Sequence, residues 1–97
     1  MILSIVIPVY NEEERIIPTL EKLKSDFIKD SSDIEILIGD DGSIDDTARV
    51  VKEFANHNSC FKFIHKKNNR GKGAILRDLV AETSGDIVLY TDADLPV

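Results

Sequence analysis

The 97-residue sequence has little of several residue types, and each scarcity excludes a class of protein. Its one cysteine, Cys60, cannot form an internal disulfide or supply a Cys-x-x-Cys pair, and no zinc ligand set is present. Lys and Arg total 12 against 18 Asp and Glu, which gives a formal net charge of −6. Because general binding to nucleic-acid phosphates depends on an excess of basic side chains, we expect no nucleic-acid partner.

Long hydrophobic runs are also missing. No stretch approaches the roughly 20 apolar residues that a membrane-spanning helix needs, so we expect no membrane segment in this part of the protein. The apolar segment 1–9 is short, lacks a basic flank and contains Pro8, which is typical of a strand and not of a signal peptide. Together with the single cysteine, these features favour a reducing, cytoplasmic setting.

The sequence does contain a repeated pattern of short apolar runs followed by turn residues. Four such runs are predicted to be strands: 3–9, 35–39, 61–65 and 86–91. The first three are each followed by an amphipathic stretch, which is the βαβ pattern of a parallel sheet. With 42% hydrophobic residues, the chain has enough apolar content for one globular α/β domain.

The amphipathic stretches predict three helices, each with one buried side. In the first, apolar residues recur at helical spacing. In the second, Ser43 is a candidate N-cap. The third is expected over 72–83. The residues expected on the buried sides are Ile16, Leu20, Leu23 and Phe27, then Ala48, Val51, Phe54 and Ala55, then Ile75, Leu76, Leu79 and Val80.

Polar residues gather where each predicted strand ends, which is the edge where open α/β sheets bind ligands. The last of these groups contains Asp92 and Asp94. Residues two apart on an extended chain project to the same side, so both carboxylates can face one cation. Hard oxygen ligands suit Mg²⁺ or Mn²⁺. The alternative is a solvated turn that is rich in aspartate.

The second strand is followed by Asp40-Asp41-Gly42-Ser43, a pattern typical of a turn and helix cap. That interpretation leaves two adjacent acids at the end of an apolar strand, where a carboxylate could accept hydrogen bonds from a nucleobase N–H. Tyr10, after the first strand, could stack on a base or close over the end of the sheet.

The third strand is followed by a basic loop. Gly71 and Gly73 let the backbone approach a ligand closely, and a helix beginning near Lys72 points its free amides outward, which suits phosphate oxygens. A solvated basic loop is the alternative. The glycine spacing matches neither G-x-G-x-x-G nor a Walker A sequence. The basic residues concentrated in and around this loop are Lys66, Lys67, Arg70, Lys72 and Arg77.

Taken together, four motifs closely resemble family 2 glycosyltransferases of GT-A fold. They are VIPVYNEE at 6–13, DDGSIDDT at 40–47, NRGKG at 69–73 and GDIVLYTDADL at 85–95. The resemblance implies a three-layer, Rossmann-like α/β fold, with about four parallel strands in the order 3-2-1-4 and helices on both faces. Within the family, the NRGKG loop is most similar to dolichyl-phosphate and polyprenyl-phosphate glucosyl- or mannosyltransferases.

The resemblance also implies roles for individual residues. A base and ribose pocket would be lined by Pro8, Tyr10 and Glu12, with Asp41 on the base. Asp92 would hold the ribose or a metal-bound water, and Asp94 would hold the metal, Mg²⁺ or Mn²⁺, against the diphosphate. Arg70 and Lys72 are expected on the diphosphate side. No catalytic base can be assigned.

The expected parent enzyme transfers a hexose, with inversion, from UDP-glucose or GDP-mannose to an acceptor such as a polyprenyl phosphate, at the cytoplasmic face of a membrane. Residues 1–97 would be its N-terminal nucleotide-sugar-binding part, inactive alone and ending just after the DxD motif. The alternative is a non-catalytic nucleotide-binding or interaction module. A phosphoacceptor receiver domain fits poorly, because its acids would follow strand one. We further expect self-association through an exposed strand at 86–91.

Overall fold

The structure is a computed structural model, and it describes residues 2–28 and 33–93. Its centre is a four-stranded sheet in which all paired strands are parallel, in the order β3-β2-β1-β4. The strands are β1 (Leu3–Val9), β2 (Ile34–Asp41), β3 (Phe61–Lys66) and β4 (Ile87–Tyr90). This confirms the predicted strand order.

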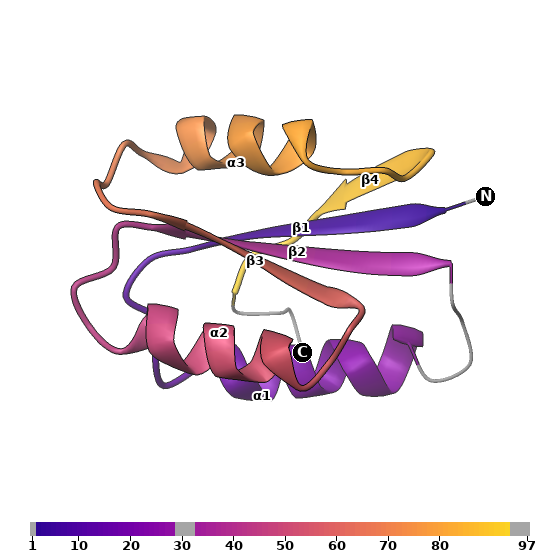
Figure 1. Ribbon diagram of the computed structural model, residues 1–97, viewed down its shortest axis with the longest axis horizontal. Coiled ribbons are helices and arrows are strands. Elements are labelled where there is room, and N and C mark those ends of the chain that lie inside the picture. Colours follow the sequence, from indigo (N-terminus) through magenta and orange to yellow (C-terminus); the bar gives the residue numbers. More distant parts are fainter. Residues whose placement is uncertain (1, 29–32, 94–97) are drawn as a thin grey trace.

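Helices cover both faces of the sheet, as predicted. Figure 1 shows α3 on one face and the pair α1 and α2 on the other. The helices are α1 (Ile16–Leu23), its π-helical continuation η1 (Lys24–Ile28), α2 (Thr47–Asn56) and α3 (Lys72–Ala81). None of the helices in the described ranges is long and apolar enough to cross a membrane.

The core has two parts because β1 and β2 are buried on both faces. Alternate residues of β1 serve different layers: Ile5 and Ile7 pack with α1 and α2, whereas Val6 packs with Ile75 and Leu79 of α3. On the α3 face, a Cβ on Gly39 would lie 2.8 Å from the Ile75 side chain. The absent side chain therefore lets α3 approach the sheet closely.

Glu35 joins several segments at the amino-terminal edge of the sheet. It is 7% exposed, and its carboxylate accepts hydrogen bonds from Ser4 Oγ (2.5 Å), Lys62 Nζ (2.9 Å), Ser84 N (2.7 Å) and Ser84 Oγ (3.1 Å). Burial on its own would raise the pKa of Glu35, but these hydrogen bonds outweigh burial and lower the pKa to about 2. The ionised carboxylate thus fixes the loop between α3 and β4 against β1 and β2.

Several local predictions were wrong. The helix expected to begin at a Ser43 cap begins at Thr47 instead, because the Ser43 hydroxyl bonds with Asp40 and accepts a hydrogen bond from the Asn11 amide. Phe27 and Val80, both expected on buried helix faces, are 45% and 48% exposed. Phe27 lies in the π-helical turn, whose wider winding breaks the 3.6-residue spacing.

Strand and helix ends also differ from the predicted ranges. β2 continues through Asp40 and Asp41, since both pair in register with β3. The fourth strand and the third helix are shorter than predicted, ending at Tyr90 and Ala81.

Candidate functional site

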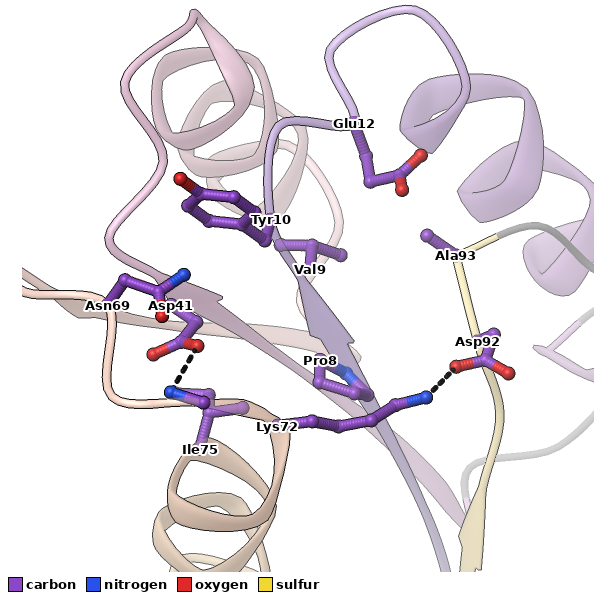
Figure 2. A pocket seen from close by; sticks show the side chains of 11 residues that line it. Pro8, Val9, Tyr10, Glu12, Asp41, Asn69, Lys72, Ile75, Asp92 and Ala93 are labelled. Carbon is purple, nitrogen blue, oxygen red and sulfur yellow. Dashed lines mark hydrogen bonds and ion pairs between the residues drawn. The ribbon is translucent and has the colours of Figure 1, made fainter.

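A cavity of about 290 Å³ lies at the carboxyl ends of the strands, at the point where the strand order reverses. Figure 2 shows that its lining comes from all four strand ends and the start of α3. The lining residues are Pro8, Val9, Tyr10, Glu12, Asp41, Asn69, Gly71, Lys72, Ile75, Asp92 and Ala93. Six predicted site residues are therefore among them: Pro8, Tyr10, Glu12, Asp41, Lys72 and Asp92.

The cleft opens because β1 and β4 part before β1 ends. Their pairing stops at Val6↔Tyr90, with one further hydrogen bond from Thr91 N to Val6 O of 3.1 Å. Pro8 lies beyond this point, still paired in register with Gly39 of β2. The chain after β4 consequently diverges from β1 and leaves room between Pro8 and Asp92.

The loop after β1 is held by the turn after β2. Asn11 has a left-handed backbone (φ 52°), and its Oδ1 accepts a hydrogen bond from Ile44 N at 3.0 Å. Glu12 N donates to Thr47 Oγ1 at 2.8 Å. These contacts set the positions of Tyr10, which is 44% exposed, and Glu12 at the edge of the cleft.

Asp40 and Asp41, adjacent in sequence, have different partners. Asp40 is fully buried, where Ser43 and the ring of His65 (Nδ1 to Oδ2, 2.8 Å) bond with its carboxylate. Asp41 faces the cleft, and its two oxygens accept hydrogen bonds from the Arg70 and Gly71 amides at 2.9 and 3.0 Å. Asp41 therefore fixes the loop that leads into α3, a contact that sequence reasoning missed.

Lys72 and Asp92 meet across the mouth of the cleft (Figure 2), with Lys72 Nζ 2.9 Å from Asp92 Oδ1. The Tyr90 hydroxyl donates to the same oxygen. The hydrogen bond to Asp92, followed by the contact with Tyr90, raises the pKa of Lys72. The hydrogen bond from Lys72, followed by the one from the Tyr90 hydroxyl, lowers the pKa of Asp92. Both groups are thus held in their charged forms.

Two predicted site residues need separate mention. Arg70 does not line the cleft: its guanidinium lies 3.5 Å from Asp78 on α3, and its side chain is 55% exposed. Asp94 lies outside the described residues, so the predicted pairing of Asp92 with Asp94 stays a prediction. Within the described ranges, there is no cluster of three or more His, Cys, Asp or Glu residues that could hold a metal ion.

The surroundings of Asp92 nevertheless fit a divalent cation. Its carboxylate supplies the hard oxygen donors that Mg²⁺ and Mn²⁺ prefer. Oδ1 already binds a cation, the Lys72 ammonium, so positive charge is accommodated at this position. A divalent cation at this carboxylate would have to lie beside the Lys72 ammonium or exchange with it.

Five lining residues were not among the predicted site residues: Val9, Asn69, Gly71, Ile75 and Ala93. Asn69 belongs to the loop 69–73 whose glycines marked it as a ligand loop, so that signal was present. Val9 is an apolar residue of β1, and Ile75 is an apolar residue of α3. The sequence does not indicate that part of either side chain lines a cavity.

Comparison with known proteins gives consistent matches. Residues 4–97 match the family model described as "Glycosyl transferase family 2". A dolichyl-phosphate beta-glucosyltransferase of Trichomonas vaginalis is 38% identical over 96 residues, covering 94% of this chain and 29% of that protein. An undecaprenyl-phosphate 4-deoxy-4-formamido-L-arabinose transferase of Proteus mirabilis is 36% identical over 94 residues, covering 95% of this chain and 28% of that protein.

Among solved structures, a mannosyltransferase from Pyrobaculum calidifontis in complex with GDP-Man and Mn²⁺ superposes with a TM-score of 0.84 and 27% identity. The match covers 95% of this chain and 27% of that one. The sheet and its helices therefore have the architecture of GT-A glycosyltransferases. The chain spans less than a third of the length of the curated relatives that it matches.

Proposed function

The chain belongs to glycosyl transferase family 2, and we propose that it is the N-terminal, donor-binding part of a glycosyltransferase that binds a UDP- or GDP-sugar with Mg²⁺ or Mn²⁺. The parent enzyme transfers glucose or mannose to an acceptor with inversion. The names of relatives that act on dolichyl or undecaprenyl phosphate favour a polyprenyl phosphate as that acceptor. The observation that carries the proposal is the cleft, where base-binding and diphosphate-binding candidates line one cavity.

We assign the base and ribose to the side of the cleft formed by Pro8, Tyr10 and Glu12. Tyr10 presents a ring for stacking at the rim. Asp41 is proposed to accept a hydrogen bond from an N–H group of the base. A carboxylate has about four lone-pair sites, and two backbone amides of the 70–71 loop use only part of that capacity.

The diphosphate belongs, in this proposal, between Lys72 and Asp92. A divalent cation held by Asp92 and Asp94 would neutralise charge on the leaving nucleoside diphosphate. Lys72 adds positive charge from the start of α3, where the positive end of the helix dipole lies. A phosphate acceptor is itself an anion and needs little help from a general base. No base is assigned to the described residues, and the cytoplasmic setting stays a prediction.

Titration calorimetry tests the proposal with UDP-glucose and GDP-mannose, each with Mn²⁺ and again after a chelator. We expect metal-dependent binding of one of the two. Asp92→Asn should weaken that binding about tenfold or more, because it removes a charged ligand. Asp26→Asn is the matched control, since Asp26 pairs only with Lys22 (3.6 Å) in the part of the chain described, on η1 away from the cleft.

Two outcomes would count against the proposal. Binding that survives both the chelator and Asp92→Asn would contradict the metal site. A melting temperature that does not rise with any nucleotide sugar, with or without Mn²⁺, would favour a non-catalytic module whose acidic turns only cap helices and fix loops.

A further inference from the structure

Lys72 and Asp92 come from different elements and form a contact that the proposed metal has to change. Lys72 is the first residue of α3, and Asp92 follows β4. The ammonium lies 2.9 Å from Asp92 Oδ1 and 5.1 Å from the centre of the Tyr90 ring. The Tyr90 hydroxyl donates to the same Oδ1. One carboxylate oxygen of the proposed metal ligand is therefore already bound by a cation of this chain.

The backbone that carries Lys72 is held by hydrogen bonds, whereas its side chain is exposed to solvent. Asp41 holds the amides of Arg70 and Gly71, which immediately precede Lys72. The Lys72 side chain is 57% exposed, and a flexible four-carbon chain carries its ammonium group. An ion pair as exposed as this one changes a binding equilibrium by up to about fivefold, so an incoming ion can displace it.

We infer that Lys72 is an internal counterion of Asp92, which a divalent cation displaces, and that the displaced ammonium then contacts the diphosphate of the donor. This inference rests on the proposed function, in which Asp92 is a metal ligand. It gives Lys72 two opposed effects. The ammonium competes with the metal while the cleft has no nucleotide, and it attracts the diphosphate once the metal is bound.

The first effect is measured with the metal alone. Mn²⁺ is titrated into the purified chain and followed by electron paramagnetic resonance of the free ion, without nucleotide. Lys72→Met keeps most of the length of the unbranched side chain and removes the competing charge, so we expect Mn²⁺ affinity to rise two- to fivefold, on the order of the strength of an exposed pair. Lys72→Arg keeps a cation there and should stay near the original affinity.

The second effect is measured with UDP and GDP at saturating Mn²⁺. Lys72→Met removes a charged donor from the diphosphate, so we expect affinity to fall about tenfold. Lys67→Met is the matched control, because it changes the net charge equally and Lys67 does not line the cleft. A purely structural role for Lys72 would weaken the binding of metal and nucleotide together, whereas the inference requires changes of opposite sign.

The outcomes separate this inference from the proposed function. If Asp92→Asn abolishes Mn²⁺ binding while Lys72→Met binds Mn²⁺ no more tightly than Lys67→Met does, the counterion role is wrong and the metal site stands. If Asp92→Asn leaves Mn²⁺ binding unchanged, both are wrong. Opposite changes in the metal and nucleotide affinities of Lys72→Met support both.

Discussion

Replacing Glu35 with Gln perturbs the network that joins the amino-terminal edge of the sheet. Glutamine has nearly the same shape, but it carries no charge and only one acceptor oxygen. Four hydrogen bonds now reach the Glu35 carboxylate, from Ser4, Lys62 and both the amide and the hydroxyl of Ser84. The substitution therefore leaves some of these donors unpaired next to a buried site.

The magnitude follows from the lowered pKa. Burial opposes ionisation, but the hydrogen bonds prevail and bring the pKa of Glu35 to about 2. An ordinary glutamate has a pKa near 4.3, and at 1.36 kcal/mol for each tenfold change in the ionisation constant the difference corresponds to about 3 kcal/mol. Because the folded-state pKa is the lower one, this stabilisation is complete above about pH 5 and is lost as the pH falls toward 2.

The assay is urea unfolding followed by circular dichroism, for the unaltered chain and Glu35→Gln, at several pH values between 7 and 3. At pH 7 the variant should be less stable by about 3 kcal/mol, and the gap should shrink below pH 5. Glu53→Gln, at an exposed position on α2, should cost less than about 0.5 kcal/mol. A gap that stays constant down to pH 3 would refute the role of the charge and leave the lost acceptor oxygen as its cause.

Two further predictions concern the turn after β2 and the exposed strand. Gly42→Ala should destabilise the fold by about 1–3 kcal/mol and weaken nucleotide binding, since φ is +75° and the new Cβ would lie 2.5 Å from Asn69 N beside the cleft. Gly73→Ala, whose Cβ would meet nothing within 4 Å, is the control in urea unfolding. β4 is an edge strand in the described sheet, with all four residues 38–48% exposed, so the chain should self-associate in sedimentation experiments. Val88→Lys should reduce that association, and a chain that stays monomeric at high concentration would contradict it.

A strand was predicted correctly where burial on both faces requires a continuous run of apolar residues. β1 is buried on both faces, so Leu3–Val9 is almost continuously apolar and its limits match the predicted ones. β2 was predicted too short, since Asp40 and Asp41 look like turn residues. Their partners, His65 and the Arg70 and Gly71 amides, lie 25–30 residues away, and nothing local in the sequence indicates them.

The site was predictable as a set of strand ends but not as a set of contacts. Tyr10, Asp41 and Asp92 were predicted as site residues because each lies at the end of a predicted strand. All three line one cleft, because the carboxyl ends of parallel strands share an edge. Arg70 shows the limit of this reasoning. Its place in the loop is set by Asp41, yet its guanidinium lies 3.5 Å from Asp78 of α3 and does not line the cleft.

Carboxylates at the two edges of the sheet differ in how far their oxygens are already engaged. At the amino-terminal edge, Glu35 is buried and accepts hydrogen bonds at both oxygens, one of them from the backbone amide of Ser84. At the carboxyl edge, Asp92 is half exposed and is bound through one oxygen by Lys72 and Tyr90, both side chains. Exchanging an exposed partner for a metal ion requires little rearrangement, whereas Glu35 has no oxygen to offer without breaking the fold. Glu35 therefore contributes to the stability of the fold, whereas the proposed metal ligand Asp92 is half exposed, so Asp92→Asn should leave the melting temperature nearly unchanged while it weakens nucleotide binding.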